Sequence, residues 1–524
     1  MPLINAMNHV ISVILSLPSV LQNEIFCEWL DLGDLGRLDS AVCNRTHRGG
    51  ILSSLNEDTC IVNPFGSIVL KEPFAAWVVS RNIKVGGTVV IPELVAGTEA
   101  CRAFFKATGN FLRIIKYPEV YQTYSTEALH PMRSVVEMAS KCAKLERFLI
   151  DGINMKEVSL RAVLTNCTKL QTLVLLLADS VNFQEINECG QYIENLHMVM
   201  CGADVPPVDP TVQFKKINNM KWLKCLLHAA YSDHESDRLA QFICSNVGLR
   251  ELHVDNLAAR HVSWILESCT ELRSLRINVL WRENNLRESE ISKLIRRMQH
   301  LRYLELTGLD LAENWLLPLL QGCTFLQALY LHNFQDAREH GLFTEIYDDD
   351  YFDDDPPLTV LHVCTISAST LSHLLHTYPH LTNVGIARST VDSIDCVLQV
   401  VHDFNVPELH LRVPETYSFT NIHLFNNLTA LYLHDCKELT NDQLLTIAHH
   451  NQYLSTLYLS GAAISTDTLM ELVDVCQELV ALHVLEKVYY QEVESFNATL
   501  RSLSPSLVTI EVRLKADINT DIDI

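Results

Sequence analysis

Several features that would assign an enzymatic or membrane function are missing from this sequence of 524 residues. It contains no glycine-rich phosphate loop ending in Lys-Ser/Thr, no His-Glu-x-x-His helix, no Gly-x-Ser-x-Gly elbow and no Cys-x-x-Cys pair. No window reaches the roughly 18 uninterrupted apolar residues of a membrane span. These absences predict a protein that is not an enzyme, with no cofactor and no metal site.

Basic charge is also scarce. The chain has 40 Lys and Arg against 63 Asp and Glu, a formal net charge of -23. A general electrostatic hold on nucleic-acid phosphates or on an anionic membrane is therefore unfavourable, and a protein partner with a basic surface is favoured. Hydrophobic residues make up 48% of the chain, which is enough for a large core.

Signals for secretion are incomplete. Residues 10–21 are apolar, but they lack a basic flank and a small-residue cleavage site. The 16 cysteines are spaced with the apolar runs, which favours reduced, buried thiols over a disulfide framework. We expect the protein in the cytoplasm, or in the nucleus.

What the sequence does contain is an internal repeat with the strand signal Leu-x-x-Leu-x-Leu, present in about fifteen copies between residues 145 and 512. Clear copies begin at Leu249, Leu272, Leu301, Leu428 and Leu454. The first apolar positions, about 22 to 32 residues apart, are Leu145, Leu170, Ile193, Leu223, Leu249, Leu272, Leu301, Leu326, Leu358, Leu381, Val406, Leu428, Leu454, Leu479 and Leu507, with the Leu223 copy the weakest.

Each copy changes from the period of a strand to that of a helix. The last four residues of the signal alternate between the two faces, whereas residues 441–448 have apolar positions three and four apart. A single strand–turn–helix unit cannot bury its own apolar face, so the units must stack. The fold class is therefore α/β, a right-handed leucine-rich-repeat solenoid with parallel strands on a concave face and helices outside.

Cysteines recur at one position of this repeat. Cys142, Cys167, Cys269, Cys323 and Cys476 each stand three residues before the first apolar position, where a packing role is favoured over a metal site. The copy with Leu431, Leu433 and Cys436, followed by Leu439-Thr440-Asn441, resembles the cysteine-containing subfamily of leucine-rich repeats.

The segment of residues 17–48 lies outside the repeat register. Its apolar residues predict two short amphipathic helices separated at Gly33-Asp34. Leu17, Pro18, Leu21, Ile25, Phe26, Asp34, Leu35, Val42 and Cys43 make this segment resemble an F-box, although the usual tryptophan after Val-Cys is absent and one extra residue precedes Leu30.

The F-box resemblance implies a small all-α N-terminal module that binds a Skp-type adaptor and, through it, a cullin. The residues implied to contact the adaptor are Leu17, Pro18, Leu21, Ile25, Phe26, Leu30, Leu35 and Val42. The alternative interpretation is that the two helices only cap the first repeat of the solenoid.

The predicted domains are the F-box-like module at 1–50, a capping or degenerate repeat region at 51–140, the solenoid at 141–515 and an acidic tail at 516–524. Within the middle region, residues 73–78 predict a helix, and residues 88–91 and 111–115 predict strands. An acidic insertion near 340–357 is expected as a surface loop.

Many of the 22 histidines fall at one register position, between the last two apolar residues of a strand. This slot faces the concave side, where large side chains with a polar end are typical of protein-binding surfaces. The candidate substrate-binding residues in it and beside it are His253, Arg276, Tyr303, Glu305, Tyr330, His332, His362, His410, Arg412, Tyr432, His434, Tyr458 and His483.

Two functions remain open from the sequence. The first is a non-catalytic substrate receptor of an SCF-type ubiquitin ligase, with a substrate protein on the concave face. The second is a scaffold or regulator of the ribonuclease-inhibitor or GTPase-activator kind, in which Arg276 or Arg412 could act on a partner's phosphate.

Overall fold

The computed structural model of the chain describes residues 13–14, 17, 25, 52–55, 61–62, 67–117, 129–151, 159–178, 183–200, 217, 220–227, 233–257, 259–279, 297–307, 316–332, 358–364, 366–386, 391–413, 417–486 and 509–514. The chain forms two compact units, residues 1–256 with 267–270, and residues 257–266 with 271–524. Within the described ranges, no helix combines the length and the apolarity needed to cross a membrane.

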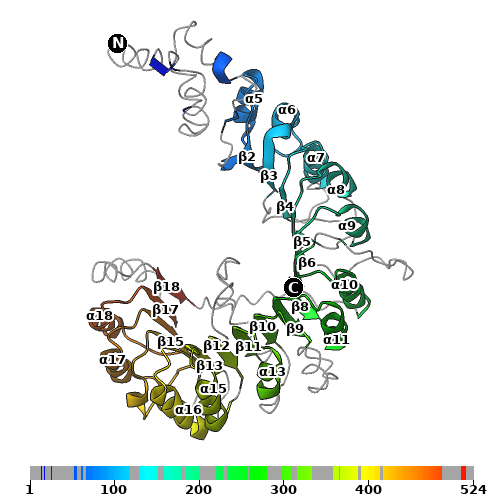
Figure 1. Cartoon of the computed structure of the whole chain (residues 1–524). Helices are drawn as coiled ribbons and strands as arrows, with labels where there is room; N and C mark the ends of the chain where they lie inside the picture. The colour runs from blue at the N-terminus through cyan, green and yellow to red at the C-terminus, as the bar shows by residue number, and fades with distance from the viewer. Residues whose placement is uncertain are drawn as a thin grey trace, which may run out of the picture. The chain divides into compact units, whose positions relative to one another are not determined.

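The first unit alternates strands and helices (Figure 1). Its elements are β1 (Ser67–Val69), α5 (Glu72–Ser80), β2 (Gly87–Val90), α6 (Glu99–Thr108), the 3-10 turn η2 (Gly109–Phe111), β3 (Leu112–Tyr117), α7 (Leu129–Ala139), β4 (Arg147–Asp151), α8 (Arg161–Asn166), β5 (Thr172–Ala178), α9 (Phe183–Cys189), β6 (Asn195–Met200), β7 (Trp222–Leu227), α10 (Asp233–Ser245) and β8 (Glu251–Leu257). Each strand from β1 to β8 pairs in parallel with the next.

The second unit repeats the arrangement, after α11 (Ala259–Ser268), whose residues are divided between the units. It contains β9 (Ser274–Val279), β10 (Tyr303–Thr307), α13 (Leu316–Gly322), β11 (Ala328–His332), β12 (Val360–Val363), α15 (Ala368–Thr377), β13 (Asn383–Ile386), α16 (Val391–Asp403), β14 (Glu408–Arg412), η6 (Ile422–Leu424), β15 (Ala430–His434), α17 (Asn441–His450), β16 (Thr456–Ser460), α18 (Thr466–Val475), β17 (Ala481–Glu486) and β18 (Thr509–Leu514). Strands β9 to β18 also pair in parallel, each with the next.

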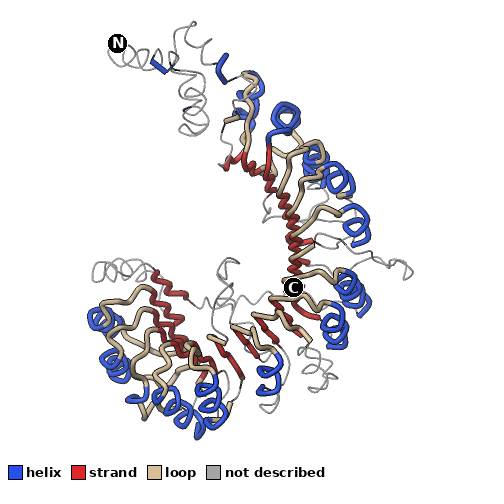
Figure 2. Tube along the Cα trace, viewed as in Figure 1, coloured by secondary structure: helices blue, strands red, loops and turns tan. Residues whose placement is uncertain are grey.

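Figure 2 shows strands on one side of each unit and helices on the other, so each unit has a strand face and a helix face. Paired strands lie about 4.8 Å apart and packed helices 8–10 Å apart, which makes the strand face the concave one. The parallel strands and returning helices are those of a leucine-rich-repeat solenoid, as the repeat signal predicts.

The repeat around β15 shows how the sequence produces this unit. Leu428, Leu431 and Leu433 are buried, whereas Tyr432 between them points to the strand face. Thr440 then caps α17 in a capping box with Gln443, which satisfies backbone N–H groups at the start of the helix. Three buried residues of α17 pack over the strands, and the next strand follows.

One repeat has a different register from the one predicted. Leu223 was assigned to the first apolar position, but it pairs with Leu196 and Leu252, which occupy the second position. Met220, which is buried, takes the first position, and the repeat reads Met-x-x-Leu-x-Cys. Methionine and cysteine replace the leucines that mark the other copies, and both fill apolar core positions.

The repeat architecture begins earlier than residue 141. Strands β1, β2 and β3 belong to the parallel sheet, with α5 and α6 between them. The helix expected at 73–78 corresponds to α5, and the strands expected at 88–91 and 111–115 correspond to β2 and β3. Residue 140 therefore does not mark a change of architecture.

The position three residues before the first apolar residue of a repeat lies in a tight turn between helix and strand, and we call it the corner. Cys142, Cys167, Cys269, Cys323 and Cys476 are all buried there, and every cysteine that the structure describes is a free thiol. The Cys167 thiol donates to the carbonyl of Ala139 at 3.3 Å, reaching the helix end of the preceding repeat. Burial raises the pKa of Cys142 and Cys269 to about 12, so these thiols are neutral packing groups.

Asparagine occupies the same corner in two repeats. The Asn451 amide donates to the carbonyls of Ile447 at 2.7 Å and Phe425 at 2.8 Å, and its oxygen accepts from the Leu428 N–H at 2.7 Å. Asn246 accepts from the Ile217 N–H at 2.9 Å in the same way. Each of these amides joins its repeat to the previous one through backbone groups that would otherwise be buried without partners.

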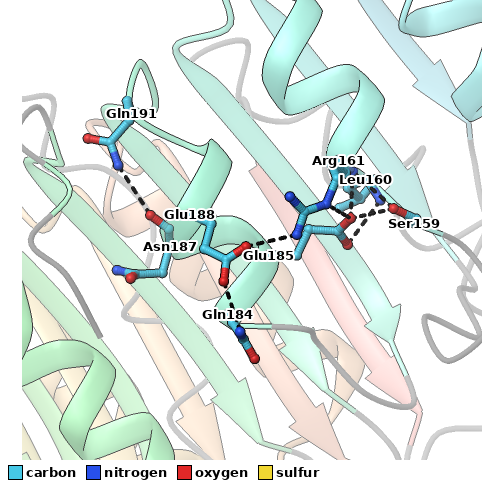
Figure 3. Close-up of polar contacts among 8 residues, drawn as sticks. All are labelled: Ser159, Leu160, Arg161, Gln184, Glu185, Asn187, Glu188 and Gln191. Carbon is cyan, nitrogen blue, oxygen red and sulfur yellow. Dashed lines mark hydrogen bonds and ion pairs between the residues drawn. The ribbon is translucent and has the colours of Figure 1, made fainter. Parts of the chain in front are cut away.

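Glu185 forms a third kind of link between repeats (Figure 3). This buried carboxylate of α9 accepts from the Ser159 hydroxyl and from the N–H groups of Leu160 and Arg161, at 3.3 and 2.8 Å, at the start of α8. The Arg161 guanidinium also donates to Glu188 at 2.8 Å. One helix thus supplies the N-terminal cap of its neighbour.

We predict that Asn451→Leu lowers the free energy of unfolding by about 2–4 kcal/mol, because it leaves buried backbone groups unsatisfied. Asn451→Cys should cost less, since cysteine occupies this corner in other repeats. Urea unfolding measures both, with His449→Ala on the exposed side of α17 as a control that changes stability by less than about 0.5 kcal/mol. An Asn451→Leu protein as stable as the control would contradict the linking role.

Candidate functional site

The strand face of the second unit carries a row of large side chains in exact strand register. On each strand from β9 to β17, one residue lies between the last two apolar positions of the repeat. This residue pairs directly with its equivalent on the next strand, without an offset. The row reads Arg276, Glu305, Tyr330, His362, Gly385, His410, Tyr432, Tyr458 and His483. The predicted slot is therefore a single line of side chains.

The rings of this row touch one another. Tyr330 and His362 have centroids 4.8 Å apart, and His410 and Tyr432 stack at 3.8 Å with planes 7° apart. Tyr303 joins at one end, 5.3 Å from Tyr330. We define the aromatic band as Tyr303, Tyr330, His362, His410, Tyr432, His434, Tyr458 and His483, whose neighbouring rings lie within 6.2 Å.

Gly385 keeps the band continuous. It occupies the slot between His362 and His410, whose rings nevertheless meet at a centroid distance of 4.4 Å. A Cβ atom at Gly385 would lie 2.5 Å from Cγ of His362. The missing side chain gives the His362 ring room to lean across β13 and reach His410. Nε2 of His362 also lies 2.6 Å from Oδ1 of Asn383.

Charged groups flank the band in pairs. Glu305 accepts from the Tyr303 hydroxyl at 2.6 Å, and its other oxygen lies 3.2 Å from Nε of Arg276. Arg412 donates to Asp435 at 2.6 Å. The two arginines nominated from the sequence are therefore both held by carboxylates.

Glu408 lies in the middle of the row of strands. One of its oxygens is 3.1 Å from Nε2 of His410, and burial raises the pKa of its carboxyl group, against the effect of a hydrogen bond from Asn383. Burial and then the charge of Glu408 raise the pKa of Tyr432 to about 12. The Tyr432 phenol is thus protonated at neutral pH and can donate a hydrogen bond.

Most rings of the band are less accessible than the sequence suggested. Tyr330, His362, His410, His434 and Tyr458 are each at most 7% exposed. Tyr303, Tyr432 and His483 are half-buried, as are Arg276 and Arg412. The half-buried residues form the accessible part of this surface.

The structure does not bring all the predicted residues together. His253 belongs to β8 of the first unit, with Nε2 3.3 Å from Oδ1 of Asp255. His332 ends β11, but its side chain lies outside the described residues. Of the predicted adaptor-binding residues, Leu17 and Ile25 are half-buried, and Pro18, Leu21, Phe26, Leu30, Leu35 and Val42 lie outside the described residues.

Sequence reasoning missed three contributors to this site. Gly385, Asn383 and Glu408 support the histidines, yet none is aromatic or basic. The repeat register could have identified Gly385 as a slot residue. Gly385 stands between the core residues Val384 and Ile386, just as His362 stands between Leu361 and Val363. In the described part of the chain, no three His, Cys, Asp or Glu residues are grouped as a metal site would require.

In the first unit, the same slot contains His197. Its neighbours on the adjacent strands are Val174 and Lys224, and Lys224 pairs in turn with His253. Burial, followed by the charges of Lys224 and His253, lowers the pKa of His197 to about 4. The His197 ring lies edge to face with Trp222, at 6.0 Å. It is therefore neutral at physiological pH.

Comparisons with known proteins find similarity among solved structures alone. No protein-family description matches the sequence, and no curated protein matches it. Among solved structures, a leucine-rich-repeat protein of Leptospira interrogans is 12% identical, with 88% of this chain and 98% of that chain covered and a TM-score of 0.33.

Two further solved structures are similar at the same level. An internalin of Listeria monocytogenes is 14% identical over 79% of this chain and 88% of its own, with a TM-score of 0.30. The yeast complex of Rad7 and Elc1 contains a chain that is 14% identical over 92% of this chain and 88% of its own, with a TM-score of 0.31. Likenesses this weak carry no argument about function, and the fold rests on the strand pairing described above.

We predict that Gly385→Ala destabilises the protein by about 1–3 kcal/mol, because the new methyl group displaces His362. In a His362→Ala background the same substitution should be nearly neutral, since the colliding ring is gone. Urea unfolding of the wild type, both single variants and the double variant measures this coupling. An equal cost in the two backgrounds would show that Gly385 serves another purpose.

His197 predicts a pH dependence of stability. Its folded-state pKa, about 4, lies below the ordinary 6.5, so its contribution is complete above pH 6.5 and is lost as the pH falls from 6.5 to about 4. Between pH 7 and pH 5, we expect the melting temperature of wild type to fall further than that of His197→Gln. The exposed-site control His450→Gln should follow wild type, and identical slopes for wild type and His197→Gln would refute the assignment.

Proposed function

We propose that the chain is a non-catalytic recognition subunit that holds a protein partner on the strand face of its second unit. The observation that carries this proposal is the aromatic band. Its rings already contact one another, so binding would immobilise few further side chains. Tyrosine, histidine and arginine also offer large contact areas that end in hydrogen-bonding groups, as protein-binding surfaces do.

The extent of the strand face favours a polypeptide over a small ligand as the partner. The half-buried Tyr303, Tyr432 and His483 lie on β10, β15 and β17, so they are spread along several strands. Strands β10 and β17 are seven strand spacings apart, about 34 Å at 4.8 Å each. A ligand that contacts all three residues must have the length of an extended peptide or a protein surface.

The proposed partner is the substrate of an SCF-type ubiquitin ligase. The F-box-like segment would bind a Skp-type adaptor and thereby a cullin, and the ubiquitin-transferring chemistry would belong to other subunits. The support for this part is the sequence match at Leu17, Pro18, Leu21, Ile25 and Phe26 together with its position before a cysteine-type repeat array.

The geometry argues against the GTPase-activator alternative. An activating arginine must be available to a phosphate on the partner. Arg276 lies 3.2 Å from Glu305, and Arg412 lies 2.6 Å from Asp435, so each would have to leave a carboxylate first. In the other alternative, the N-terminal helices only cap the solenoid. A chain that binds the adaptor would argue against that alternative.

The test is co-precipitation of the full chain with a purified Skp-type adaptor. We expect the wild type to retain the adaptor and Leu17→Ala/Pro18→Ala to lose it, because the first helix would no longer dock. Tyr303→Ala/Tyr432→Ala is the matched control on the strand face and should bind the adaptor as wild type does.

The outcomes separate the two halves of the proposal. If the wild type fails to bind the adaptor, the ligase role is wrong and the solenoid assignment is unaffected. If the adaptor binds, ubiquitination of proteins crosslinked to the chain should fall in Tyr303→Ala/Tyr432→Ala. Undiminished ubiquitination in that variant would place the substrate elsewhere than on the aromatic band.

A further inference from the structure

The first unit has a cleft at the edge of its sheet where strands β3 to β6 begin. The cleft has a volume of about 480 Å³, which lies within the roughly 300–1,000 Å³ of small-molecule sites. One row of its lining comes from equivalent positions of four successive repeats, namely Arg113, Glu146, Gln171 and Glu194. The cleft includes no residue of the aromatic band, so a ligand bound here goes beyond the proposed function.

Backbone hydrogen bonds hold this row in place. The N–H of Glu146 donates to the carbonyl of Arg113 at 2.7 Å, and the N–H of Gln171 donates to the carbonyl of Glu146 at 2.9 Å. The N–H of Glu194 donates in turn to the carbonyl of Gln171, also at 2.9 Å. The row therefore continues the strand pairing, with neighbours about 4.8 Å apart. Its backbone is preorganised, so a ligand would not have to order it.

Each carboxylate of the lining is held by a cation. Nε of Arg113 donates to Oε1 of Glu146 at 2.8 Å, and Nζ of Lys221 donates to Oε2 of Glu194 at 2.9 Å. The described part of the chain supplies no donor to the second oxygen of either carboxylate. Glu146 and Glu194 are therefore fixed acceptors whose charge is already balanced.

Neutral polar groups complete this side of the cleft. Gln171 stands between Glu146 and Glu194 in the row, and its amide offers both donors and an acceptor. Thr168 adds a hydroxyl group. Both side chains are exposed, and within the described ranges neither one forms a side-chain hydrogen bond. A ligand that both donates and accepts hydrogen bonds would find partners for each of its groups here.

Tyr192 gives the cleft an aromatic surface. It is 47% exposed, and no other ring of the described residues lies against it. It belongs to a tight turn whose corner position is Gly190, where a Cβ atom would lie 2.5 Å from the carbonyl oxygen of Ile186. Glycine thus replaces the cysteine or asparagine of other corners, and the turn leaves the Tyr192 ring open to a ligand.

The charge of the lining is unsuited to ionic ligands. Arg113 and Lys169 balance Glu146 and Glu194. A phosphate would approach two carboxylates, and a basic peptide would compete with cations that already hold them. An apolar peptide is also disfavoured, because Tyr192 is the only lining residue with a large apolar surface, whereas peptide-binding surfaces use several such anchors.

We propose that this cleft binds an uncharged carbohydrate, with one sugar ring stacked on Tyr192 and its hydroxyl groups bonded to Gln171, Glu146 and Glu194. Sugar hydroxyls donate and accept, so they match carboxylate oxygens that accept and an amide that does both. The C–H groups on the less polar face of a sugar ring suit the negative face of the tyrosine ring.

The test is a microarray of oligosaccharides, each in an uncharged and a sulfated form, probed with the fluorescently labelled full chain. We expect stronger signals from the uncharged forms. Calorimetry with the uncharged oligosaccharide of strongest signal should show an affinity that falls at least about tenfold in Tyr192→Ala, because the stacking surface is lost. Tyr192→Phe keeps the ring and should stay within about threefold of wild type.

The matched control is Tyr453→Ala. Tyr453 stands directly before the first apolar position of its repeat, as Tyr192 does, and it is 72% exposed. The control should bind the oligosaccharide as wild type does, and all variants should melt as wild type does, since the changed residues are exposed. No bound oligosaccharide, a preference for sulfated forms, undiminished binding by Tyr192→Ala, or equal weakening in the control would overturn the proposal.

Discussion

The in-register parallel pairing of successive strands is the constraint on which the rest of this protein depends. The repeat of β15 buries Leu428, Leu431 and Leu433, and its strand pairs with both neighbours, with Leu431 beside Leu409 and Leu457. A slip of one residue would expose the apolar positions and bury the slot residues, so the burial of leucine fixes the register. The properties of the strand face of the second unit follow from this zero offset.

Polar groups inside the stack reinforce the same constraint. The Asn451 amide, the Cys167 thiol and the Glu185 carboxylate all bind backbone groups of a neighbouring repeat. They use different chemistry at the ends of helices, where backbone groups lack helical partners. Corner cysteines are accordingly buried and neutral, and their regular spacing reflects packing.

Because neighbouring strands pair in register, residues that occupy the same slot in successive repeats lie side by side. A residue type that recurs in this slot therefore forms a continuous surface. In the second unit, tyrosines and histidines form the aromatic band, and Gly385 lets the band pass a strand that contributes no ring. In the first unit, the same slot carries aliphatic residues and lysines. One architecture therefore presents two strand faces of different composition.

The sequence alone determined the class of fold, the strand positions and the direction in which Tyr432 or His410 points, because leucine periodicity and burial are local properties of each repeat. It misplaced the repeat at Met220, where methionine and cysteine fill positions that leucine marks elsewhere. Only the tertiary structure decided that Glu305 and Asp435 hold the two arginines and that the His362 ring crosses Gly385. Those facts depend on distances between side chains from different repeats, and such distances exist only once the strands are paired.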